Sequence, residues 1–72
     1  MIEWAELNSG GIKKIGYDSM QKQLHVRHED DHYIIYYQVR ETEYIGMLSS
    51  SNMKTFYEKN IKGRFPSSEV NA

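Results

Sequence analysis

The segment Tyr33–Val39 is the feature that most constrains what this chain can fold into. It holds three of the six tyrosines, and as a strand it would carry apolar or aromatic side chains on both faces. The even face would be formed by Ile34 and Tyr36. The odd face would be formed by Tyr33, Ile35, Tyr37 and Val39. Because a strand of an antiparallel sheet usually buries only one face, the second face needs internal cover or a partner.

Length and composition set limits on how this segment can be covered. A chain of 72 residues forms one domain and buries roughly 60% of its unfolded surface, so its core is marginal. It has no cysteine for a disulfide or a thiolate-bound metal. Aromatic packing or association must therefore stabilise it. No apolar run approaches the roughly 20 residues that cross a bilayer, and the segment Met1–Glu6 does not resemble a signal peptide, so we expect a cytoplasmic protein with no membrane partner.

The period of apolar residues predicts three strands. One runs from Ile12 to Asp18, and a second carries Leu24 and Val26 in alternation with polar residues. Charged residues 29–31 form a hairpin turn, and the tyrosine segment follows as the third strand. The arrangement is typical of a three-stranded antiparallel meander.

After Val39 the spacing becomes helical. Thr42 is a suitable N-cap for a first helix that carries Tyr44 and Met47, and Ser51 can cap a second. The apolar stripe of the second helix consists of Met53, Phe56, Tyr57, Ile61 and Phe65. Gly63 and Pro66 mark its end. We therefore predict an α+β fold, β-β-β-α-α, with two helices packed on one face of the sheet.

The chain divides into three parts on this interpretation. Residues 1–11 form an N-terminal segment that can dock on the sheet through Ile2, Trp4 and Leu7. Residues 12–66 form the domain. Residues 67–72 are a polar tail that we expect to be disordered.

Several short motifs resemble those of the KTSC domain family, which is named for the C-terminus of some lysyl-tRNA synthetases. The resemblance runs from about Ile12 to Pro66. Its elements are Ile15-Gly16-Tyr17-Asp18, Leu24-His25-Val26, Tyr36 three residues before Val39, Tyr44, Leu48, Ser51, Phe56, Ile61 and Phe65-Pro66. The chain departs from the family pattern at Ile34, Arg40, Ser49, Met53 and Tyr57.

The resemblance implies a small bacterial or phage-encoded domain whose general function is unknown and for which RNA binding has been suggested. The residues are compatible with this role. Unpaired bases can stack on tyrosines, and cations can meet phosphates. The candidate residues on the sheet are Tyr33, Ile35, Tyr37, Lys13, Lys14 and Arg27. Those on the helices are Lys54, Lys59, Lys62 and Arg64. If the helices cover the even face, these two groups lie on opposite sides of the sheet.

A protein-interaction or homodimerisation module is the alternative. The apolar odd face is a surface that monomers avoid exposing, and pairing two copies would bury it. Internal cover by Ile2, Trp4 and Leu7 would remove that need equally well. The net charge of −1 argues against a protein that is basic throughout.

The remaining classes of site lack a matching pattern. His25, His28 and His32 flank an acidic turn, but alternation directs the first two to opposite faces, so we expect no metal. No nucleophile elbow or glycine-rich phosphate loop is present, so we expect no catalytic residue, cofactor or small-molecule substrate.

Overall fold

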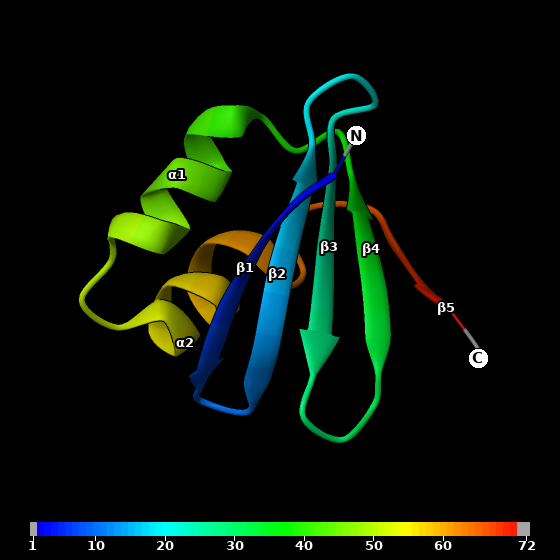
Figure 1. Cartoon of the computed structure of the whole chain (residues 1–72). Coiled ribbons are helices and arrows are strands. Elements are labelled where there is room, and N and C mark those ends of the chain that lie inside the picture. Colours follow the sequence, from blue (N-terminus) through cyan, green and yellow to red (C-terminus); the bar gives the residue numbers. More distant parts are fainter. Residues whose placement is uncertain (1, 71–72) are drawn as a thin grey trace.

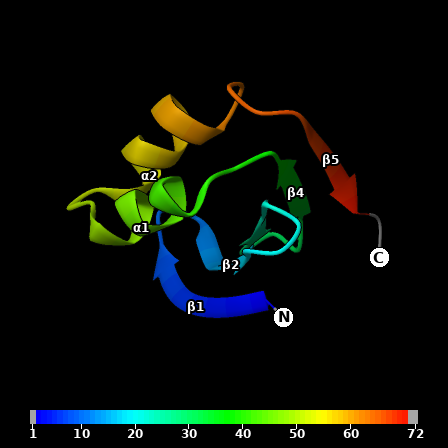
Figure 2. The same cartoon turned by 90° about the horizontal axis from the view of Figure 1, so that it is seen from above.

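Five antiparallel strands form one sheet whose spatial order follows the order of the chain (Figure 1). The computed structural model describes residues 2–70. The strands are β1 (Ile2–Ser9), β2 (Ile12–Asp18), β3 (Gln23–His28), β4 (Tyr33–Tyr37) and β5 (Ser67–Val70). The helices are α1 (Glu41–Ser49), α2 (Met53–Phe56) and a π-helical turn, η1 (Tyr57–Ile61). Viewed from above, the helices lie together on one side of the sheet, and β1 and β5 form its two edges (Figure 2).

The α+β class and the helices on one face are as predicted, but the prediction of three strands is wrong. The N-terminal segment is itself a strand, with Ile2 paired to Asp18 and Trp4 to Gly16. Gly10 and Gly11 have φ of 61° and 81°, so they turn the chain back beside β2 and bring the segment to the edge of the sheet.

The fifth strand lies where the sequence predicts a disordered tail. Residues 67–70 pair with β4, and the amide of Tyr37 donates to the carbonyl oxygen of Pro66 at 2.8 Å. All four residues of β5 are exposed, so the strand is held by its backbone ladder with β4 and has no apolar pattern for a sequence to display. Residues 71–72 of the predicted tail, and Met1 of the N-terminal segment, lie outside the described residues.

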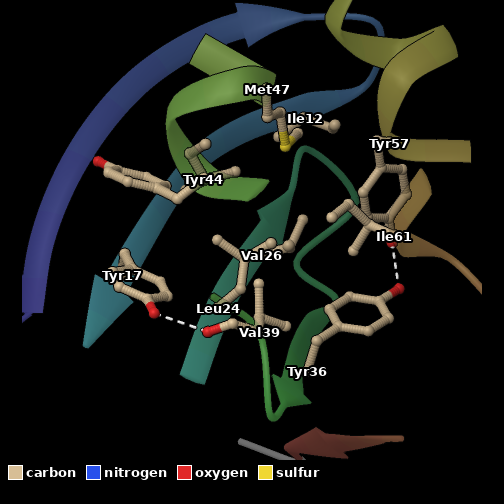
Figure 3. Close-up of a cluster of buried hydrophobic side chains, with 11 residues drawn as sticks. Ile12, Tyr17, Leu24, Val26, Tyr36, Val39, Tyr44, Met47, Tyr57 and Ile61 are labelled. Atoms are coloured by element: carbon tan, nitrogen blue, oxygen red, sulfur yellow. Dashed lines mark hydrogen bonds between the residues drawn. The ribbon is translucent and has the colours of Figure 1, made fainter. Parts of the chain in front are cut away.

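The even face of β4 forms the core together with the helices (Figure 3). Tyr36 is 3% exposed, and its hydroxyl lies 2.5 Å from that of Tyr57. Across the core, the Tyr17 hydroxyl donates to the carbonyl oxygen of Val39 at 2.6 Å. The buried apolar residues are Ile12, Ile15, Tyr17, Leu24, Val26, Tyr36, Val39, Tyr44, Met47, Tyr57 and Ile61.

The prediction that Val39 belongs to the odd face is wrong. Gln38 adopts a φ of 62°, which ends the alternation of β4. Val39 is therefore turned into the core and is fully buried. The odd face consists of Tyr33, Ile35 and Tyr37 alone.

The helix caps also differ from those predicted. Arg40 occupies the N-cap of α1 without a side-chain cap bond, so Thr42 lies inside the helix. Asn52 caps α2 by accepting a hydrogen bond from the amide of Thr55 at 3.1 Å. Among the described helices, none is long and apolar enough to span a membrane.

Candidate functional site

The sheet face opposite the helices, here called the outer face, carries the odd residues of β4. The register places Trp4, Gly16, His25 and Ile35 in one row across four strands. A neighbouring row consists of Glu6, Lys14, Arg27 and Tyr33. Paired residues of antiparallel strands share a face, so these two rows bring aromatic and basic side chains together.

Trp4, His25 and Tyr33 form an aromatic cluster on the outer face. The Trp4 ring lies edge-on to both neighbours, with centroids 6.1 Å from His25 and 6.2 Å from Tyr33. Gly16 makes this arrangement possible, because a Cβ there would lie 2.8 Å from the indole. Trp4 remains 40% exposed, so one part of the indole covers the cluster and the rest faces solvent.

His25 lies at the base of this cluster. It is 6% exposed, and its Nδ1 lies 2.6 Å from the Tyr33 hydroxyl. Its Nε2 is buried and has no hydrogen-bond partner among residues 2–70. Burial lowers the pKa of His25, and the negative charge of Asp18 opposes this shift. The neutral imidazole is thus a structural support for the exposed Trp4 ring and the half-buried Tyr33 ring above it.

Two cations lie on the aromatic rings. The Lys14 ammonium is 4.7 Å from the Trp4 ring centroid, and the Arg27 guanidinium is 4.8 Å from that of Tyr33. Cation–π attraction holds each cation beside its ring without removing it from solvent. The predicted sheet-side residues Tyr33, Lys14 and Arg27 therefore meet at one place, and Trp4 joins them.

Ile35 and Tyr37 are half-buried farther along the odd face. Ile35 pairs with Ser68, and the Tyr37 hydroxyl lies 2.6 Å from Ser68 Oγ. Cover of the odd face is thus shared between Trp4 at one end and β5 at the other. Leu7, which the sequence suggested as cover, packs against the core instead.

The other predicted cations do not join the cluster. Lys13 is exposed at the point where β2 shifts register against β3. Lys54, Lys59, Lys62 and Arg64 are exposed on the helix side of the sheet. The expected separation between the tyrosine face and the helix cations is therefore present.

A hollow of about 180 Å³ lies on the helix side, and sequence reasoning missed it. Its lining includes Gly10, His28, Lys54, Tyr57 and Lys62, which come from three distant parts of the chain. Burial, followed by the hydrogen bond with Tyr36, raises the pKa of Tyr57. No local motif could have revealed this site, because the β1–β2 turn, the end of β3 and the α2–η1 segment meet there only in the folded chain.

Comparison with known proteins agrees with the motifs and with this fold. The family model described as the KTSC domain matches residues 8–65. The chain belongs to the KTSC domain family. A crystal structure of a KTSC domain protein from Yersinia pestis is similar, with a TM-score of 0.92 and 22% sequence identity over 99% of this chain and 100% of the other. No curated protein matches the chain.

The KTSC motif residues lie mostly inside the domain. Ile15, Tyr17, Leu24, Val26, Tyr36, Val39, Tyr44 and Ile61 are all buried. The rings and cations that meet on the outer face, Trp4, Lys14, Arg27 and Tyr33, lie outside these motif positions. The family motifs thus account for the buried core of the fold.

The three histidines of this KTSC domain lie apart. His25 faces outward, whereas the His28 ring packs on Tyr57 with a centroid distance of 5.8 Å. His32 Nδ1 lies 2.7 Å from Glu69, and this hydrogen bond, with the charge of Asp30, raises the pKa of His32. Within the part of the chain that the structure describes, no group of three or more candidate ligands could hold a metal ion.

Proposed function

We propose that this KTSC domain is a non-catalytic module that binds single-stranded RNA through its outer face. The observation that carries the proposal is the pairing of each ring of the outer face with a cation: the exposed Trp4 with Lys14 at 4.7 Å, and the half-buried Tyr33 with Arg27 at 4.8 Å. Stacking on exposed rings combined with nearby cations is the usual chemistry of proteins that bind unpaired strands.

The cation–π contacts suggest how binding proceeds. A base that stacks on Trp4 or Tyr33 would displace the cation from the ring, and the cation would then meet the phosphate beside that base. The cluster is supported from below by His25 and Gly16, so the rings need little reordering. Each base stacked on an aromatic ring contributes about 1–3 kcal/mol.

A binding role fits this face better than a catalytic one. The imidazole of the cluster is covered by Trp4 and has its Nδ1 beside the Tyr33 hydroxyl, so it is not open to a substrate. The aromatic and cationic side chains of this face, the exposed Trp4 and Arg27 and the half-buried Tyr33 and Lys14, can bind and orient a strand.

The first experiment measures RNA binding to the whole chain. A labelled single-stranded RNA of about 10 nucleotides is titrated at low salt and followed by fluorescence anisotropy. Trp4 is the single tryptophan, so its fluorescence reports stacking directly. We expect saturable binding, quenching of Trp4, and weakening as salt rises. Absence of binding at low salt would contradict the proposal.

Charge variants then test whether RNA binds to the outer face. The double variant Lys14→Gln/Arg27→Gln should weaken binding about tenfold or more and lower the salt dependence, because about two phosphate contacts are lost. Lys59→Gln is the matched control, since it removes an exposed cation from the helix side. Equal weakening by the control would show diffuse attraction and not a site on the outer face.

The same face could instead pair with a protein, including a second copy of this chain. Light scattering at high protein concentration distinguishes the two outcomes. A monomer that binds RNA supports the proposal. A dimer that Lys14→Gln/Arg27→Gln dissociates, without RNA binding, would assign the outer face to self-association.

A further inference from the structure

The hollow on the helix side gathers polar groups that the proposed RNA face does not use. It lies between the β1–β2 turn at Gly10, the end of β3 at His28, and the helical segment that carries Lys54, Tyr57 and Lys62. A second hollow of about 200 Å³ adjoins it and shares His28, Tyr57 and Lys62. The shared wall is thus the centre of a larger concave surface.

Tyr57 and His28 supply a hydroxyl and an imidazole to the shared wall. The Tyr57 hydroxyl lies 3.4 Å from His28 Nε2 and is linked on its inner side to the hydroxyl of Tyr36. Tyr57 is 4% exposed, so this hydroxyl is fixed by its packing. Because these two groups share a contact, the pair has one hydrogen left to donate to an acceptor in the hollow, from the Tyr57 hydroxyl or from the other ring nitrogen of His28 according to the tautomer.

The π-helical turn positions the cationic side of the hollow. The amide of Lys62 donates to the carbonyl oxygen of Tyr57 at 2.8 Å, five residues earlier, which widens this turn. The wider turn places Tyr57, Glu58 and Lys62 along the same wall. Turns of this kind are rare and occur frequently at functional sites.

Lys54 completes the site from the opposite end of the helical segment. Its side chain packs on Gly10, where an added Cβ would lie 2.8 Å from Lys54 Cβ. The β1–β2 turn therefore holds the stem of Lys54 against the hollow. The lining of the first hollow contains two ammonium groups, Lys54 and Lys62, against one carboxylate, Glu58. The adjoining hollow adds the carboxylate of Asp30.

We propose that this hollow binds the phosphate group of a phosphate monoester. Two ammonium groups and one donor from the Tyr57–His28 pair suit an anion with several acceptor oxygens, and a volume of about 180 Å³ admits such a group. The site is separated from the outer face by the sheet, so it does not depend on the proposed RNA face. The phosphate can come from a free small molecule or from the end of a nucleic-acid strand.

The test is a titration of the whole chain with inorganic phosphate, followed by amide NMR shifts at ionic strength matched with chloride. We expect saturable shifts confined to the surroundings of Gly10, Lys54 and Lys62. Lys62→Gln should weaken binding about tenfold, because a charge-assisted hydrogen bond is lost. Glu58→Gln should tighten it several-fold, since the repelling carboxylate is removed.

Lys59→Gln is the matched control, because Lys59 belongs to the same π-helical turn but does not line the hollow. Unchanged binding by this variant supports the proposal. Absence of saturable shifts in the unaltered chain, or equal weakening by Lys59→Gln and Lys62→Gln, would overturn it.

Further comparisons identify the source of the phosphate and test whether its site is independent of the proposed RNA face. Shifts at the hollow caused by a 5′-phosphorylated oligonucleotide, but not by its 5′-hydroxyl form, would support the proposal and assign a strand end. Equal affinity for inorganic phosphate and the phosphorylated strand would support a free small molecule. The Lys14→Gln/Arg27→Gln variant should leave phosphate binding intact. Loss of phosphate binding in this variant would contradict a site separate from the outer face.

Discussion

The hydroxyl pair Tyr36 and Tyr57 is the most constrained polar contact of the core. Both side chains are almost fully buried, and their hydroxyls lie 2.5 Å apart (Figure 3). A buried hydroxyl that loses its partner costs more than a hydrogen bond contributes, because the remaining group is neither solvated nor paired. The two tyrosines should therefore behave as one unit in mutagenesis.

We expect Tyr57→Phe to lower the free energy of unfolding by about 1–3 kcal/mol, because it leaves the Tyr36 hydroxyl unpaired. Tyr36→Phe should cost less, since Tyr57 keeps its contact of 3.4 Å with His28. The double variant should cost clearly less than the sum of the two single variants. Urea denaturation followed by circular dichroism measures all three.

Tyr37→Phe is the control for this cycle. The Tyr37 hydroxyl contacts the exposed Ser68 and is open to water, so its removal should change stability by less than about 0.5 kcal/mol. Strictly additive costs for the Tyr36 and Tyr57 variants would mean that the two hydroxyls do not depend on each other.

Single residues also explain why one face of β4 was predictable. The alternation of Ile34 and Tyr36 correctly indicated the core, and Tyr33, Ile35 and Tyr37 correctly indicated a separate face. Val39 could not be assigned from alternation, because the positive φ of Gln38 interrupts the strand. Trp4 was one of the residues expected to cover the odd face, and its place beside Tyr33 depends on Gly16 in another strand.

At the scale of elements, the middle of the chain was more predictable than its ends. Strands β2, β3 and β4 each contribute buried apolar side chains, so their period is visible in the sequence. β5 has four exposed residues, and its position is set by the free edge of β4. Backbone pairing of this kind leaves almost no trace in a sequence.

Truncation after Pro66 tests the contribution of β5. Removing residues 67–72 should lower the free energy of unfolding by about 1–2 kcal/mol, because several ladder hydrogen bonds to β4 are lost. It should also increase self-association, since the exposed edge of β4 carries Tyr33, Ile35 and Tyr37. Urea denaturation and light scattering measure the two effects.

Ser68→Ala is the control for the truncation. It removes the hydroxyl contact with Tyr37 but keeps the backbone ladder, so it should leave stability nearly unchanged. A truncated chain as stable and as monomeric as the full chain would show that β5 contributes nothing to the sheet.

The whole molecule is a sheet whose one face packs against the helices and whose outer face carries Trp4, Lys14, Arg27 and Tyr33. The motif residues concentrate on the helix-covered face, so the sequence was sufficient to predict the family and most of the core. The hollow beside Tyr57 joins residues 10, 28, 54 and 62, and only the assembled molecule brings them together. Sites of that kind need the three-dimensional structure.

The pH dependence of stability is also a property of the whole molecule, because two histidines act on it in opposite directions. The folded-state pKa of His25 is lowered, so the unfolded chain binds more protons as pH falls through about 6.5, and stability decreases. The folded-state pKa of His32 is raised, so its contribution is present below about 6.5 and is lost as pH rises through the folded value.

Variants at the two positions should separate these contributions between about pH 7.5 and pH 5.5. His25→Asn, which keeps a polar atom near Nδ1 for Tyr33, should reduce the loss of stability on acidification, because the unfolded chain then has no imidazole at this position to bind a proton. His32→Gln should make the loss steeper, because the bond from a protonated imidazole to Glu69 is removed. Urea midpoints measured across this pH range give the pH dependence of stability for each variant. Parallel pH profiles for His25→Asn and the unaltered chain would contradict a buried neutral His25, since the proton would then bind equally well in the folded and unfolded states.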